Sequence, residues 1–178
     1  MPTSTVDLWE TITVEAGRES RLWRDALRPA AERESEPVFS PLGEERYALG
    51  LESIYEGYLA HYGRPRLFDP PDQDTSLLLG DYLYAHGLVR VADVGAVEAV
   101  ADLAELISLC AQLRADEAAG DGAAWAASAA LLGEGALDEA RTALRDDGDS
   151  DPLLELAKAH AGEAAVDRAL EAHDRRLR

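Results

Sequence analysis

The sequence predicts an all-α protein, a helical bundle of about six to seven helices. Apolar residues recur at steps of three and four along the chain, which is the period of one helix face. No alternation of apolar and polar residues typical of a β-strand lasts beyond a few positions. At 178 residues the chain is expected to form one domain, residues 1–178, and to bury about 70% of its unfolded surface.

Proline, glycine and capping residues separate the expected helices. Pro37 and Pro41 mark a connector, and Gly63 and Pro65 end the helix that follows it. Pro152 suits the first position of the last helix, which lies within residues 150–178. Helices, with their candidate caps, are expected over residues 6–34 (Thr5), 43–62, 76–89 (Asp74 or Thr75), 93–119 (Asp93), 123–132, 136–145 and 150–173 (Ser150 or Asp151).

The charge balance excludes two classes of partner. The formal net charge is −18, with 35 acidic against 17 basic residues, so nucleic acid and anionic lipid would be repelled. Lys158 is the only lysine, and the remaining basic residues are arginines. High acidity with little lysine favours a halophilic protein from a high-salt cytoplasm. A GC-rich genome would by itself explain the abundance of arginine and alanine.

Cysteine and histidine offer no metal or redox site. Cys110 is the only cysteine, so an internal disulfide is impossible, and it lies in an apolar run that predicts a core position. The four histidines form no pattern of ligand spacing. The chain has no signal-like N-terminus and no run of 18 apolar residues, so we expect a cytoplasmic protein without stable membrane insertion.

Three features between residues 43 and 117 occur in a fixed order and spacing. Glu52 and Glu56 lie on a helix, Gly63-Arg64-Pro65 follows as a turn, and Gly80-Asp81 comes fifteen residues after Pro65. This layout resembles the trans-isoprenyl diphosphate synthase (polyprenyl synthetase) family, in which DDxxD, Gly-x-Pro and Gly-Asp take these places. The resemblance implies a core over residues 43–117 that is similar to part of the isoprenoid synthase fold.

The resemblance also implies a site. In the family, carboxylates of the aspartate-rich motif hold Mg²⁺ ions that bridge to a diphosphate, and nearby arginines bind the phosphates. Carried over by position, the candidate metal and diphosphate residues are Glu52, Glu56, Arg64, Arg66 and Asp81.

Each of these candidates also has a structural interpretation. Glu52 and Glu56 suit a solvated acidic face, and Arg64 and Arg66 suit the surface of a loop. Asp81 would either hydrogen-bond to a group on a neighbouring segment or face water. Gly80, in the middle of a helix, indicates close packing against a neighbouring helix, since glycine there costs about 1 kcal/mol relative to alanine.

The departures from the family pattern favour a protein without catalysis. Ser53 replaces a motif carboxylate, and His61 and Tyr62 replace an arginine pair. The only candidate for a second aspartate-rich motif, residues 146–151, lacks an apolar helix around it. The chain is also about half the usual length of the family.

Three functions remain open. The first is a non-catalytic pseudoenzyme, a dimer-forming partner or regulatory subunit of an isoprenyl diphosphate synthase, with no cofactor. The second is a divergent prenyltransferase that uses Mg²⁺ and isoprenyl diphosphates. The third is an unrelated helical interaction domain. We expect no activity from the chain on its own.

Overall fold

The computed structural model describes residues 7–94 and 97–177, and the regular structure in these ranges is helical throughout. Within them no β-strand forms, and one isolated bridge joins Leu27 and Phe68. The all-α prediction is therefore confirmed for these ranges, while Thr5 and Val6 lie outside the described residues. The α-helices are α1 (Leu8–Glu19), α2 (Arg21–Asp25), α3 (Ala48–Tyr62), α4 (Gln73–Asp93), α5 (Val97–Ala115), α6 (Asp121–Ala130), α7 (Asp138–Asp147), α8 (Asp151–Ala161) and α9 (Glu163–Leu177).

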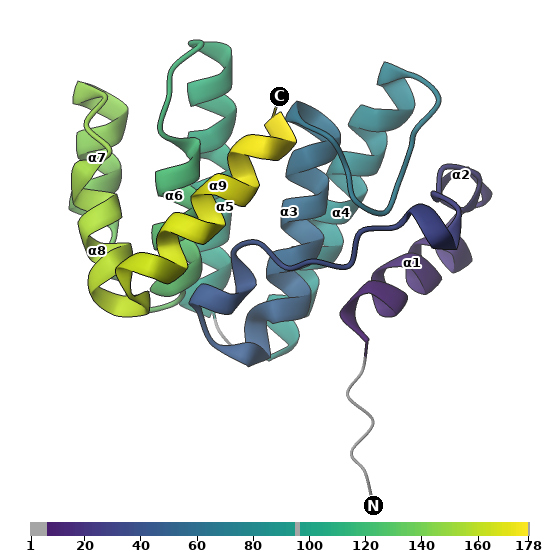
Figure 1. The fold of residues 1–178 in the computed structure, drawn as a ribbon, viewed down its shortest axis with the longest axis horizontal. Coiled ribbons are helices and arrows are strands. Elements are labelled where there is room, and N and C mark those ends of the chain that lie inside the picture. Colours follow the sequence, from purple (N-terminus) through teal and green to yellow (C-terminus); the bar gives the residue numbers. More distant parts are fainter. Residues whose placement is uncertain (1–6, 95–96, 178) are drawn as a thin grey trace, which may run out of the picture.

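The predicted first helix, residues 6–34, is wrong beyond Glu19. Ser20 has an extended backbone, and its hydroxyl accepts a hydrogen bond from the Leu22 N–H at 3.1 Å. A serine that caps the next turn competes with helix continuation, so α1 ends and the short α2 begins. Residues 26–47 then form a connector that crosses in front of α3 (Figure 1). It contains three short 3-10 helices, η1 (Ala30–Glu32), η2 (Ser40–Leu42) and η3 (Glu45–Tyr47).

The predicted last helix is also wrong as a single element. It is divided at Gly162, whose φ of +89° is unfavourable for residues with a side chain. The chain turns there, and α9 packs back against α8, α6 and α3. The N-terminal cap of α4 is Asp72, which accepts from the Thr75 N–H at 2.7 Å, rather than Asp74 or Thr75.

Helix α3 lies in the middle of the molecule, with α4 beside it, and α9 passes in front of α5 and α6 so that its C-terminal end lies next to the end of α3 (Figure 1). Residues 50–60 of α3 are all buried. A helix that is enclosed on every side must satisfy each polar side chain internally. The polar residues of α3 therefore define the internal chemistry of the fold.

Close contact between α3 and α4 depends on glycine. A Cβ atom added to Gly57 would lie 2.9 Å from the Gly80 carbonyl oxygen, and one added to Gly80 would overlap the His61 ring. Seven residues earlier on α3 and seven residues later on α4, Gly50 and Gly87 make a similar contact. The predicted packing role of Gly80 is confirmed.

The apolar core extends from α3 into the C-terminal half of the chain. Cys110 is buried in it, as predicted, and burial raises the pKa of its thiol. Trp125 on α6 is buried against Phe39, Tyr55 and Tyr58. Among the described helices, none combines the length and the apolar character that crossing a membrane requires.

Candidate functional site

Two carboxylates on α3 converge on one arginine. Glu52 and Glu56 lie one turn apart, and Arg66 reaches them from the loop after α3. The Arg66 Nη1 atom lies 2.6 Å from Glu52 Oε2, and Arg66 Nε lies 3.0 Å from Glu56 Oε2. All three side chains are at most 1% exposed. The alternatives of a solvated acidic face and a surface loop arginine are therefore wrong for these residues.

The remaining carboxylate oxygens of this cluster also have donors. Glu52 Oε1 accepts from the Ser40 N–H at 3.3 Å, and Glu56 Oε1 accepts from the Leu67 N–H at 2.7 Å. Every carboxylate oxygen thus has a protein hydrogen-bond donor. Mg²⁺ binds through such oxygens, and in this arrangement a guanidinium occupies the position between them.

Arg66 connects the cluster to neighbouring segments. Its Nη1 donates to the Glu36 carbonyl at 3.0 Å, and its Nη2 to the Glu52 carbonyl at 3.3 Å. Its guanidinium lies over the rings of Trp9 and Tyr55, 4.7 and 5.1 Å from their centroids. The residues Glu52, Glu56 and Arg66, hereafter the α3 ion cluster, thereby join α1, the connector and α3.

The other two candidates lie elsewhere. Arg64 is exposed, and its backbone N–H donates to the Arg176 carbonyl at 3.0 Å. Asp81 is 73% exposed on α4, and its Oδ1 lies 3.2 Å from His61 Nε2. Burial lowers the pKa of His61, and the nearby Asp81 charge partly opposes this shift. The structure brings together Glu52, Glu56 and Arg66 but not Arg64 and Asp81, so binding of Mg²⁺ or diphosphate by all five stays a prediction.

A second polar network lies deeper in the bundle, and the sequence analysis missed it. Arg114 Nη2 donates to the Tyr58 hydroxyl at 2.7 Å, and both side chains contact the Asp121 carboxylate. His173 Nδ1 lies 2.9 Å from the Tyr55 hydroxyl, while His173 Nε2 lies 3.6 Å from Asp121. These residues come from α3, α5, α6 and α9, and no local sequence pattern links them.

The electrostatics of this network stabilise an ionised Asp121. Burial acts to raise the Asp121 pKa, but His173, Tyr58 and Arg114 together hold it well below the ordinary value of 3.8. Burial and the neighbouring Asp121 charge raise the pKa of the Tyr58 hydroxyl, which therefore stays protonated and donates. The network is therefore a buried, charge-paired cluster in which Arg114 lies against the Asp121 carboxylate.

A third buried pair joins α5 to α7. Arg141 Nη1 lies 2.8 Å from Asp102 Oδ1, and the other Asp102 oxygen accepts from the Gly133 N–H at 2.8 Å. In each of the three internal clusters, an arginine neutralises carboxylate charge. Removing one member of such a pair leaves a buried charge without compensation, which is strongly destabilising.

The outer face of α4 carries apolar residues that the rest of the described chain leaves partly uncovered. Leu78 and Val89 are 56% and 57% exposed, and Leu77 beside them is 42% exposed. Leu78 and Val89 belong to a row of five residues that follow one another in alternating steps of four and three, which is the heptad signal of a helix-pairing seam. That signal is present in the sequence but was not used in predicting the site. The seam consists of Leu78, Tyr82, Ala85, Val89 and Ala92.

The described residues contain no group of three or more histidine, cysteine or acidic side chains placed to hold a metal ion. Comparison of the chain with protein-family models, with curated proteins and with solved structures found no match.

Proposed function

We propose that this chain is a non-catalytic helical partner protein that pairs through α4 with an isoprenyl diphosphate synthase. The observation that carries the proposal is the α4 seam, in which Leu78 and Val89 are 56% and 57% exposed and Tyr82 between them is half-buried against Trp23. Exposed leucine and valine on one face of a helix mark a surface that another protein can cover.

The α3 ion cluster supports the absence of catalysis. Magnesium at Glu52 and Glu56 would require Arg66 to leave both carboxylates and become a buried cation without a partner. Leaving one charge of a buried pair unpaired costs about 3–5 kcal/mol. The prediction of a divergent prenyltransferase therefore needs a rearrangement of the core, whereas the partner hypothesis needs none.

The charged residues beside the seam indicate which kind of partner surface would complement it. Asp74, Asp81 and Asp93 are exposed on α4, and the only arginine on that helix, Arg90, is engaged with Glu15 of α1. A partner helix with apolar residues at its own seam and basic residues beside it would complement this surface. Asp81 thereby acquires a role in recognition.

The choice of an isoprenyl diphosphate synthase as the partner rests on the sequence resemblance. Residues 43–117, which carry that resemblance and the expected likeness to part of the isoprenoid synthase fold, include all of α4. Members of one family that pair do so through equivalent surfaces, so a related chain that retains such a surface is suited to pair with them.

Co-expression with an isoprenyl diphosphate synthase of the same genome tests the proposal. Size-exclusion chromatography with light scattering should show a stoichiometric complex. The double variant Leu78→Glu/Val89→Glu should weaken this complex by more than about tenfold, because each glutamate places a charge in an apolar seam. Thr142→Glu, an exposed position on the distant α7, serves as control and should leave the complex intact.

Two results would contradict the proposal. A complex that survives the double variant would exclude α4 as the pairing surface. If the chain alone self-associates and the double variant abolishes this, α4 would still be the pairing surface. The partner would then be a second copy of the chain and not the synthase.

A further inference from the structure

A groove of about 470 Å³ lies between α9 and residues 34–42 of the connector, away from the α4 seam. Its walls include apolar side chains of the connector, such as Val38 and Leu42, and small side chains of α9, such as Ala169. A groove of this volume and mixed lining is of the size that holds small organic molecules.

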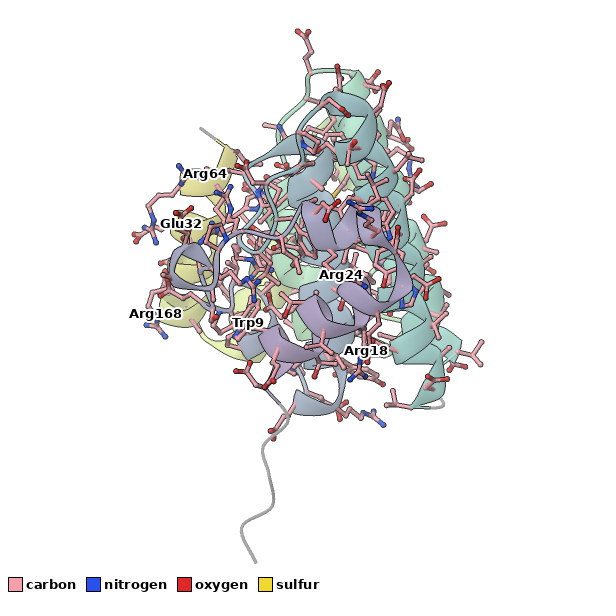
Figure 2. The ribbon with its side chains drawn as sticks, turned by 90° about the vertical axis from the view of Figure 1, so that its right-hand side faces the viewer. Trp9, Arg18, Arg24, Glu32, Arg64 and Arg168 are labelled. Carbon is pink, nitrogen blue, oxygen red and sulfur yellow. The ribbon has the colours of Figure 1, made fainter. Side chains whose placement is uncertain are left out.

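Arginines are concentrated at this groove. Arg64, Arg168, Arg175 and Arg176 all line it. Figure 2 shows Arg64 near the upper end of α9 and Arg168 further down the same helix. The carboxylates among the lining residues are fewer: Glu34, Glu36 and Glu171. With four arginines against three glutamates, the groove differs from the rest of a chain whose net charge is −18, and it repels anions less than the remaining surface does.

The Arg176 guanidinium is only partly hydrogen-bonded within the protein. Its side chain is 8% exposed, and Nη2 is bonded to Glu34 Oε2 at 2.5 Å. That hydrogen bond is the main reason why the Glu34 pKa is lowered. Among the described residues, Nη1 of the same guanidinium is buried without any hydrogen-bond partner. A buried guanidinium N–H without an acceptor is rare, and either a water molecule or an oxyanion would satisfy it.

The backbone holds two of these arginines together. The Arg64 N–H donates to the Arg176 carbonyl at 3.0 Å, so the loop after α3 is attached to the last turn of α9. Arg175, on the same turn, is exposed and has no hydrogen bond or ion pair to the described residues. Guanidinium groups from two segments thereby border one space.

We propose that this groove binds a small amphiphilic oxyanion, a phosphate or carboxylate attached to an apolar chain. The arginines at the C-terminal end of α9 and Arg64 receive the charged head, because a planar guanidinium pairs with two oxygens at once. Val38, Leu42 and Ala169 contact the apolar chain. The inference does not depend on pairing through α4.

Calorimetric titration of the full chain with octyl phosphate, octanoate and inorganic phosphate, at about 0.1 M salt, tests the inference. One of the octyl compounds should bind saturably and more tightly than inorganic phosphate. Amide NMR shifts on binding should be confined to residues 34–42, Arg64 and α9.

The variants Arg64→Gln and Arg175→Gln, both at exposed positions, should each weaken binding by about tenfold, since each removes one charged contact. Arg21→Gln, an exposed arginine on α2, is the matched control and should bind as the parent chain does. Folding of each variant is verified by its thermal unfolding.

Three results would overturn the inference. The first is the absence of saturable binding by any of the three compounds. The second is binding that Arg64→Gln and Arg175→Gln leave unchanged. The third is inorganic phosphate binding as tightly as octyl phosphate, which would refute the assigned apolar contacts.

Discussion

Arg66 stands between Glu52 and Glu56, where a paired-carboxylate motif would hold a metal ion. The guanidinium bonds to both carboxylates and offsets one of their two negative charges, while the backbone N–H groups of Ser40 and Leu67 donate to Glu52 and Glu56 respectively. Burial of such a cluster gives little net stability, but removing one member leaves charge without compensation. The fold therefore depends on each member of the α3 ion cluster.

Arg66→Met should destabilise the protein by about 3–5 kcal/mol, because two carboxylates would remain buried without a cation. Urea unfolding followed by circular dichroism measures this change. Arg64→Met, two residues away and exposed, is the control and should change the free energy of unfolding by less than about 0.5 kcal/mol. If Arg66→Met and Arg64→Met lower the free energy of unfolding equally, Arg66 has no special structural role.

The lowered pKa of Asp121 predicts how the stability of the protein depends on pH. Its pKa is lower in the folded chain than the ordinary 3.8, so its contribution is fully present above that value and is lost as the pH falls through the folded pKa. Asp121→Asn should lower the free energy of unfolding near pH 7, and the difference from the parent chain should shrink below about pH 4. A difference that is constant from pH 7 to pH 3 would contradict the ionised network.

At the scale of elements, the separation of α3 and α4 is set by glycine contacts. Gly87→Ala should destabilise by about 1–3 kcal/mol, although alanine is the better helix former, because the new Cβ would overlap Ile54 and lie 2.9 Å from the Gly50 carbonyl oxygen. The matched control is Gly17→Ala in α1, where the nearest atom is 3.7 Å away. This change should be neutral or stabilising, and loss of stability in both variants would contradict a packing role.

Elements with strong periodicity could be predicted from the sequence, and those governed by single residues could not. The helix expected over residues 43–62 is present as α3, Ala48–Tyr62, so its end followed from local pattern while its start lies five residues later than expected. The packing of Gly80 also followed from local pattern. The end of α1 depends on one serine cap, which the apolar periodicity around it concealed.

The candidate site was harder to predict because burial is a tertiary property. Two glutamates at i, i+4 look solvated in an acidic chain, and only the fold places Arg66 between them. Asp121 and His173 are far apart in sequence, so no spacing rule brings them together. The α4 seam is the exception, since its heptad spacing is visible in the residues themselves.

At the scale of the whole molecule, the net charge of −18 creates self-repulsion that salt can screen. Raising KCl from about 0.1 M to about 1 M should increase the Tm by several degrees, since the Debye length falls from about 10 Å to about 3 Å. Differential scanning calorimetry measures this shift. A Tm that is unchanged or lower in high salt would argue against the halophilic interpretation of the composition.

Whether a divalent cation binds at the α3 ion cluster distinguishes a structural protein from a metal-dependent enzyme most directly. Amide NMR of the full chain titrated with Mn²⁺, which prefers the same oxygen ligands as Mg²⁺, reports where a divalent cation binds. Glu52, Glu56 and Arg66 should show less paramagnetic broadening than the exposed segment 146–149, which carries three aspartates, because Arg66 occupies the space between the two carboxylates. Strongest broadening at Glu52, Glu56 and Arg66 would contradict the structural role of the cluster and restore the carboxylates as a metal site.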